Sequence, residues 1–490
     1  METTSQERHD RKSNKSSGLS ALMAACQQDD EAAVRIIIQE KRHLVTTRDK
    51  SGKTALHYCT GNKDITCADF VLKTEPSLIN KQDEEGYTAL HLAVISGNIL
   101  MTKYLIDKGA DVNSVDNELH SCVHWATVCG ELDCSDILIN AGGNPNTPDV
   151  HGAYPIHYAS QMCGPDSDMG NNVTLGLSVL HKLLDRGVAV DVQDKDGRQP
   201  LLWAASAVKM NYSSGSSDAI VALVNADASV MAEDKDGLTA LHCAASRGHV
   251  GCVETLINLC GAEVDTSDNN GCTALFYAVT LGYADCTQLL LQYGAEPNLQ
   301  DRKERTAAHC GAAKGQLETL KILGAKGGNL WMTNMRGDIP LHEAVQSGRK
   351  DLVLWLLSLK PSAVNAQNHN GRTALHIAAI TDNIEICNIL LDYKANINAV
   401  LRTNKGQLMT PLDVTLRRGN KSCAKYLHLH GALPASRLLE NKDIIRSFGP
   451  WKKLRINELH QLKETCLQLE SVWNRVLMRK GHDQSPCRLT

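Results

Sequence analysis

A four-residue phrase close to Thr-Ala-Leu-His recurs along this chain of 490 residues and constrains its fold more than any other feature. Successive copies start 34, 33, 33, 45, 40, 34, 33, 33, 34 and 37 residues apart. A sustained period of this length indicates a repeat architecture, in which each unit buries its apolar face against the next. The eleven copies start at Thr54, Thr88, Ser121, Tyr154, Gln199, Thr239, Thr273, Thr306, Ile339, Thr373 and Thr410.

The residues around each phrase predict a turn followed by two short helices. An Asp or Asn precedes a Gly by three residues, as Asp83 precedes Gly86. This is turn chemistry, because the Asx side chain bonds nearby amides and Gly tolerates positive φ. The Thr or Ser of the phrase is typical of a helix N-cap, and Pro155 stands where a first helical residue is expected. Apolar residues at helical spacing, such as Val253 and Leu256, predict the second helix.

Together these residues resemble the ankyrin repeat, and the resemblance covers residues 19–433. It implies an all-α ankyrin-repeat solenoid of about eleven to twelve helix-turn-helix units with β-hairpin fingers, followed by a short helical tail. We therefore divide the chain into a disordered N-terminus (1–18), the ankyrin repeat array (19–433), a C-terminal helical segment (434–480) and a disordered tail (481–490).

Some units depart from the pattern. Leu119 and Glu304 stand where the turn Gly is expected, and Leu202, Phe276 and Asp413 replace the His of the phrase. The resemblance implies that this His braces the hairpin through hydrogen bonds. We therefore expect these units to be present but looser than the others.

The two longest intervals contain insertions at residues 161–172 and 209–218, between the first and second helix of a unit. Insertions on one edge of a solenoid often mark a binding face. Surface loops also tolerate extra residues at low entropic cost, which is the alternative interpretation.

No motif that carries catalysis stands out. The chain has no Gly-rich phosphate loop, no recognisable Ser-His-Asp arrangement and no paired catalytic carboxylates, so we expect no enzyme activity, no cofactor and no small-molecule substrate. His120, Cys122 and His124 lie close together, but His124 occupies the bracing position of its repeat, so we expect no metal site there.

The cysteines and the hydropathy pattern bear on location. Seventeen Cys without any Cys-x-x-Cys pair fall mostly on repeat helices, which favours buried thiols in a reducing compartment over a disulfide framework. We expect a cytoplasmic protein, with a nuclear or cytoskeleton-associated address left open. No apolar run reaches 18 residues, so no spanning helix is expected.

Charge is unevenly distributed. Residues 434–490 carry a net charge of +5 and residues 1–18 a net charge of +1. Since the whole chain has a net charge of −4, the array itself has a net charge of −10. The later fingers and the end of the last first helix are nevertheless basic. We predict that this basic stripe binds an acidic peptide of a partner protein through bidentate Arg contacts; an ordinary solvated face is the alternative. Nucleic acid is not an expected partner of so acidic an array. The stripe consists of Arg302, Lys303, Arg305, Arg336, Arg372, Arg417 and Arg418.

The tail carries apolar residues at heptad-like spacing, from Leu459 to Val476, on a helix expected within 451–480. Three interpretations stay open. The helix caps the array, it mediates self-association or partner docking, or it is a basic target for a calmodulin-like protein or a membrane surface. Leu462 and Cys466 also fit the start of an elongin-binding box, but Glu470 stands where that box requires an apolar residue.

These observations favour a non-catalytic scaffold or adaptor that binds partner proteins through the concave ankyrin groove. The alternative is a substrate receptor of a ubiquitin ligase that recruits the ligase through the C-terminal helix. One fold hosts many functions, so the partner's identity does not follow from the repeats.

Overall fold

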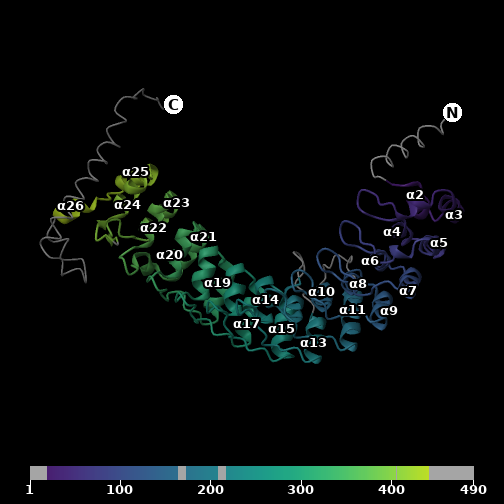
Figure 1. Ribbon diagram of the computed structural model, residues 1–490. Coiled ribbons are helices and arrows are strands. Elements are labelled where there is room, and N and C mark those ends of the chain that lie inside the picture. The colour runs from purple at the N-terminus through teal and green to yellow at the C-terminus, as the bar shows by residue number, and fades with distance from the viewer. Residues whose placement is uncertain (1–18, 164–172, 208–216, 404, 441–490) are drawn as a thin grey trace, which may run out of the picture. The chain divides into compact units, whose positions relative to one another are not determined.

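The computed structural model describes residues 19–163, 173–207, 217–403 and 405–440. These residues contain twelve consecutive helix pairs, which confirms the predicted all-α repeat architecture (Figure 1). They fall into two compact units, Met1–Asn269 (unit 1) and Asn270–Thr490 (unit 2). Each unit is described by itself.

Unit 1 contains seven of the pairs. Its first helices are α2 (Ala21–Gln27), α4 (Ala55–Cys59), α6 (Ala89–Ile95), α8 (Cys122–Val128), α10 (Pro155–Met162), α12 (Pro200–Ser206) and α14 (Ala240–Arg247). Its second helices are α3 (Glu31–Glu40), α5 (Thr66–Thr74), α7 (Ile99–Asp107), α9 (Leu132–Asn140), α11 (Val173–Asp185), α13 (Ser217–Asn225) and α15 (Val250–Asn258). Two 3-10 turns, η1 (Arg42–Thr46) and η2 (Pro76–Leu78), complete it.

Unit 2 contains the other five pairs. Its first helices are α16 (Ala274–Leu281), α18 (Ala307–Lys314), α20 (Pro340–Gln346), α22 (Ala374–Ile380) and α24 (Pro411–Arg418). Its second helices are α17 (Ala284–Gln292), α19 (Leu317–Ala325), α21 (Lys350–Leu359), α23 (Ile384–Asp392) and α25 (Lys421–Leu429). The 3-10 turn η3 (Pro361–Asn365), the strands β1 (Leu401–Arg402) and β2 (Leu408–Met409) and the helix α26 (Ala435–Glu440) complete it.

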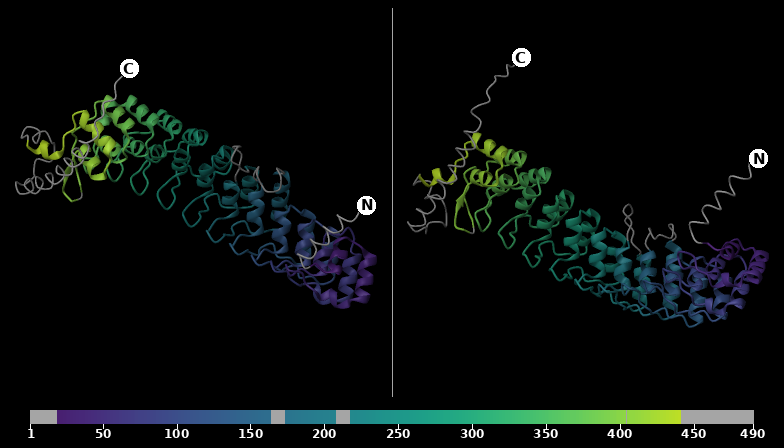
Figure 2. Two further views of the ribbon diagram at one scale, coloured as in Figure 1. Left: turned by 90° about the horizontal axis from the view of Figure 1, so that it is seen from above. Right: turned by 45° about the horizontal axis from the view of Figure 1, so that its top comes forward.

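The helices of each unit stack in rows. Within a unit each first helix contacts the next first helix, and second helices line up beside them (Figure 2). Small and aliphatic side chains fill the space between the rows, as Ala89, Leu90, Ala93 and Val94 of α6 are almost fully buried. The paired helices have five to thirteen residues and are marginal alone, so this burial between neighbours is what keeps them folded.

In six copies of the phrase the His joins its first helix to the finger of the next repeat, whereas Nε2 of His91 in the second copy has no hydrogen-bond partner. In the first copy, the Thr54 amide donates to Nδ1 of His57 at 3.1 Å, and Nε2 of His57 lies 3.0 Å from the Tyr87 carbonyl oxygen. An amide only donates and a carbonyl only accepts, so the ring is neutral with its proton on Nε2. Burial lowers the pKa of His57, in agreement with this assignment.

Asp413 provides a brace of its own, so the expected loss does not occur there. Its carboxylate accepts from the Thr410 amide (2.9 Å), the Thr410 hydroxyl (3.0 Å) and the Ala435 amide (2.8 Å). A carboxylate has lone pairs for all three donors, which a neutral imidazole does not. This unit is therefore held to the chain that follows it.

The fingers are hairpins closed by their turn residues rather than by long strands. Within the described residues only β1 and β2 pair as strands, and Val115 and Ser121 form one isolated bridge. In the second finger, Oδ1 of Asp83 accepts from the amides of Glu85 (3.1 Å) and Tyr87 (2.8 Å). Leu119 and Glu304 adopt φ of 65° and 56°, so these two turns keep the left-handed conformation without Gly.

A main-chain hydrogen bond joins each finger to the next one in the same unit. In unit 1 the Glu84 amide donates to the Ser51 carbonyl oxygen at 2.9 Å, and Asn117 donates to Glu85 at 3.1 Å. This close approach explains Gly86, since a Cβ there would lie 2.6 Å from the Asn117 nitrogen. The fingers of a unit therefore form one continuous row.

Several predicted features lie wholly or partly outside the described residues. The segments 1–18, 451–480 and 481–490 do, as do most of the insertions at 161–172 and 209–218. Of the predicted segment 434–480, α26 is described. Among the residues that are described, no helix combines the length and apolarity needed to span a bilayer.

Candidate binding surfaces

Four turn carboxylates of unit 1 bond to aromatic side chains that follow nine residues later. Each aromatic residue lies on the first helix of its repeat and donates to Oδ2, while Oδ1 holds the turn. The four pairs are Asp49 with Tyr58 (2.7 Å), Asp116 with Trp125 (3.0 Å), Asp149 with Tyr158 (2.5 Å) and Asp194 with Trp203 (3.0 Å). The finger and first helix of each of these repeats are thus joined through a polar contact.

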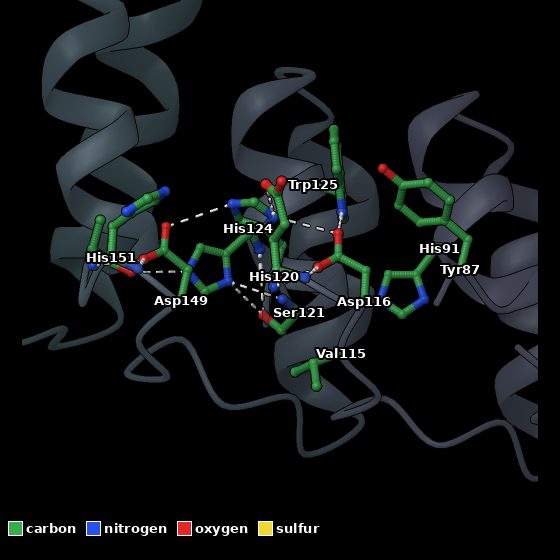
Figure 3. A network of polar contacts seen from close by, with 12 residues as sticks. Tyr87, His91, Val115, Asp116, His120, Ser121, His124, Trp125, Asp149 and His151 are labelled. Atoms are coloured by element: carbon green, nitrogen blue, oxygen red, sulfur yellow. Dashed lines mark hydrogen bonds and ion pairs between the residues drawn. The ribbon is translucent and has the colours of Figure 1, made fainter. Parts of the chain in front are cut away.

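Three of these rings form a row from repeat to repeat together with Tyr87 and His120, which we call the aromatic row; the three are Trp125, Tyr158 and Trp203. Tyr87 meets Trp125 edge to face with ring centroids 5.6 Å apart, and Tyr158 meets Trp203 in the same way at 5.6 Å. His120 lies between these pairs, with its ring centroid 5.6 Å from that of Trp125 (Figure 3). Its centroid is 6.1 Å from that of Tyr158. All five rings are half-buried, so one side of the row faces solvent.

His120 also connects two turn carboxylates. Its Nδ1 lies 3.3 Å from Oδ2 of Asp116 and its Nε2 lies 3.5 Å from Oδ2 of Asp149 (Figure 3). The carboxyl groups are only 4% and 0% exposed, so both contacts are shielded from water. Burial and the bond to Asp149 raise the pKa of the Tyr158 hydroxyl, which therefore stays protonated and donates.

The last carboxylate of the row carries a cation as well as an aromatic donor. Burial alone raises the pKa of Asp194, but hydrogen bonds from Arg198 and Trp203 outweigh it and hold the pKa below its usual value. Nε of Arg198 donates to Oδ2 at 2.8 Å, and its guanidinium lies 5.4 Å from the Trp203 ring centroid. This niche therefore accepts a guanidinium between a carboxylate and an indole.

The Asp83 finger lacks both kinds of donor. Leu92 stands nine residues after Asp83, and Tyr87 stands at the position that Arg198 holds in its own finger. Oδ2 of Asp83 has no hydrogen-bond partner although the residue is only 7% exposed. Glu84 and Glu85 add two exposed carboxylates beside it.

The predicted basic stripe lies in unit 2, and its finger residues fall on adjacent fingers. Arg302, Lys303 and Arg336 are exposed. The Met335 amide donates to the Lys303 carbonyl oxygen at 3.1 Å, which fixes the spacing of these two tips. Arg336 is 72% exposed at its side chain and lies 3.7 Å from the Asp338 carboxylate.

The other members of the stripe are placed differently. Arg305 is half-buried and bonds Asp301 through Nε at 2.8 Å and Nη2 at 2.7 Å, so it serves the turn. Arg372 is half-buried in its finger. Arg417 and Arg418 lie in the last turn of α24 rather than in a finger, and Nη1 of Arg417 contacts the sulfur of Met409 at 3.6 Å.

An acidic side chain also enters this region. Glu343 of α20 is half-buried, and burial raises its pKa while Arg336 and Arg305 lower it. Glu343 therefore partly offsets the positive charge of the stripe close to α20. The positive charge at the exposed finger tips is not offset in this way.

The aromatic row was not predicted from the sequence, although a signal for it exists. Reading nine residues on from the first five turn carboxylates gives Tyr58, Leu92, Trp125, Tyr158 and Trp203. In a chain with only 4% aromatic residues, this concentration at one repeat position is informative. Across the part of the chain that is described, no group of three His, Cys, Asp or Glu residues has the arrangement of a metal site.

Comparison with known proteins gives both a family and relatives. The family model "Ankyrin repeats (3 copies)" matches residues 3–78, 71–149, 207–301, 294–365 and 341–437. Inversin of Canis lupus familiaris is 30% identical over 226 residues, covering 44% of this chain and 20% of inversin. The NF-kappa-B inhibitor cactus of Drosophila melanogaster is 37% identical over 212 residues, covering 42% of this chain and 40% of cactus. The E3 ubiquitin-protein ligase KEG of Arabidopsis thaliana is 28% identical over 289 residues, covering 49% of this chain and 17% of KEG. The matches thus span less than half of each relative.

Proposed function

The chain belongs to the ankyrin repeat family, whose repeats mediate protein–protein interaction, and we propose that it is a non-catalytic scaffold or adaptor. We propose further that the exposed finger tips of unit 2 bind an acidic segment of a partner protein. The observation that carries this proposal is the row of Arg302, Lys303 and Arg336 on fingers joined by main-chain bonds.

The geometry of the tips supports recognition of carboxylates. No ion pair within the described residues engages Arg302 or Lys303, so their charges are available to a partner. Arg presents a planar fork of donors that matches a carboxylate, and successive tips offer such donors at a fixed spacing. Arg305 supports the surface indirectly, because it holds Asp301 and with it the turn.

Charge reversal tests this proposal. We expect the variant R302E/K303E/R336E to lose most of the proteins that the full chain captures in quantitative affinity purification. Arg305 is left unchanged because its loss would loosen the turn. The control K326E/K421E/K425E makes the same charge change at exposed residues that are not in the fingers, and should capture the same proteins as the unaltered chain. Equal capture by all three proteins would contradict the proposal.

The same purification distinguishes the ubiquitin-ligase alternative. Co-purification of elongin or cullin subunits would favour a substrate receptor, and their absence favours a scaffold. The residues on which that alternative depends, Leu462, Cys466 and Glu470, lie outside the described residues.

We also propose that this protein is located in a reducing compartment, of which the cytoplasm is our first choice. The fifteen cysteines among the described residues are all free thiols. Burial raises the pKa of Cys243 and Cys286 to about 12, which keeps these two thiols protonated and unreactive.

A further inference from the structure

The repeats of unit 1 show which groups complete a turn carboxylate. Oδ2 of Asp194 accepts from Arg198, four residues on, and from Trp203, nine residues on. In the Asp116 finger the same oxygen lies near His120 and accepts from Trp125. Four turn carboxylates of unit 1 thus have a donor at one or both of these positions.

Asp83 has no such donor, and Asp234 has Leu238 and Cys243 at the two positions. Within the described residues, however, Asp83 is the turn carboxylate whose Oδ2 is buried without a partner. Tyr87 and Leu92 occupy the two donor positions, and neither donates to Oδ2, which has no partner. A buried carboxylate oxygen without a donor is costly, because it has lost its hydration without gaining a bond. A donor that comes from another molecule would remove this cost.

The Asp83 and Asp116 fingers favour a cation as that donor, although the preceding finger carries Arg48, Lys50 and Lys53. The fingers at residues 82–88 and 115–121 carry five carboxylates and no Lys or Arg. Four of them flank Asp83, at Glu84, Glu85, Asp116 and Glu118. The half-buried rings of Tyr87 and Trp125 lie beside them and offer π faces to a cation.

We propose that this surface, formed by the Asp83 and Asp116 fingers with Tyr87 and Trp125, binds an arginine-bearing basic segment of a partner protein. The guanidinium takes beside Asp83 the place that Arg198 holds beside Asp194 and over Trp203. Arg suits this place better than Lys, because its planar group stacks on a ring while it donates to a carboxylate. Oδ2 is covered in the free chain, so the side chains over it must move when the segment binds.

This inference concerns unit 1 and goes beyond the proposed function, which rests on unit 2. The two surfaces have opposite charge and would select opposite segments. Failure of one therefore says nothing against the other.

Fluorescence anisotropy with defined peptides tests the proposal on the full chain. The probe is a labelled peptide of alternating Arg and Gly, compared with its Lys and Glu counterparts. We expect the Arg peptide to bind most tightly, the Lys peptide more weakly and the Glu peptide not to bind at this surface. Addition of salt should weaken binding of both basic peptides.

Two variants locate the site. The substitution D83N keeps the turn, because Asn334 and Asn368 hold the same turn elsewhere in the chain, and should weaken Arg-peptide binding at least 3-fold. The variant E84Q/E85Q/E118Q should weaken it at least 10-fold. A matched control, E233Q/D236N/E263Q, changes three exposed acids of unit 1 outside this surface and should leave binding unchanged.

Three results would overturn the proposal. The first is that the Arg peptide fails to bind, and the second is that the control loses as much affinity as E84Q/E85Q/E118Q. The third is self-association in analytical ultracentrifugation that E84Q/E85Q/E118Q abolishes, which would assign the surface to a second copy of this chain.

Discussion

The bracing histidines should make this protein sensitive to mild acid, and His124 allows the effect to be calculated. Its Nδ1 accepts the Ser121 amide at 3.0 Å, and its Nε2 lies 3.3 Å from the Ala153 carbonyl oxygen. A proton on Nδ1 would break the first of these bonds in a buried site. Burial accordingly lowers the pKa of His124 to about 4, from 6.5 in an unfolded chain.

The sign of the effect follows from proton binding. Between pH 6.5 and 4 the unfolded chain binds a proton at His124 that the folded chain excludes, so the free energy of unfolding falls as the pH falls. A difference of 2.5 pKa units corresponds to about 3.4 kcal/mol in total, of which about 2 kcal/mol is lost between pH 7 and pH 5. The stability is fully present above pH 6.5.

The variant His124→Gln isolates this contribution. A Gln amide can accept from Ser121 and donate toward Ala153 but does not titrate, so H124Q should be less stable at pH 7.5 and depend less on pH. Urea unfolding followed by circular dichroism at pH 7.5, 6 and 5 gives the difference between the two proteins. We expect this difference to shrink by about 2 kcal/mol from pH 7.5 to pH 5. A difference that stays constant over this range would refute the reasoning.

Three further perturbations follow from the turns and braces. Replacing Leu119 or Glu304 by Gly should stabilise the chain by about 1 kcal/mol in urea unfolding, because each residue holds a left-handed φ; equal or lower stability would count against backbone strain there. Asp413→Ala should lower the free energy of unfolding by about 2–3 kcal/mol, because it leaves buried amide donors unpaired. Asp413→Asn should lower it less, and equal losses for the two variants would show that the hydrogen bonds are unimportant. Leu92→Trp should raise the melting temperature, because an indole at this position can donate to Asp83 as Trp125 donates to Asp116, and Leu92→Phe, which has no donor, is the control.

The repeat architecture could be predicted because short segments of sequence determine it. Each phrase contains its own cap, brace and turn, so eleven copies predicted eleven of the twelve helix pairs. The first pair, α2 and α3, carries a degenerate copy, Ser20-Ala21-Leu22-Met23, which was not counted, so this pair was included only through the wider estimate of eleven to twelve units. Ser20 caps α2 in place of the missing Thr.

The features that could not be predicted from the sequence are mostly ones in which one residue type does the work of a different type. Asp413 braces its unit although a carboxylate does not resemble an imidazole, and Leu119 holds a turn that Gly holds elsewhere. Apart from His120 and Trp125, the rings that meet in the aromatic row lie more than thirty positions apart, so the row becomes visible only when the repeats are aligned. The role of Arg305 was within reach, since Asp301 precedes it by four residues, as Asp194 precedes Arg198.

The bonds that join neighbouring fingers have a consequence for how such a protein evolves. They use amide and carbonyl groups, which every residue except proline provides in full. A mutation at Glu84 or Arg302 therefore leaves its link to the preceding finger in place, while the side chain at that tip is replaced. Under the proposed function, substitutions along the tips can therefore change binding specificity one residue at a time without disrupting the fold.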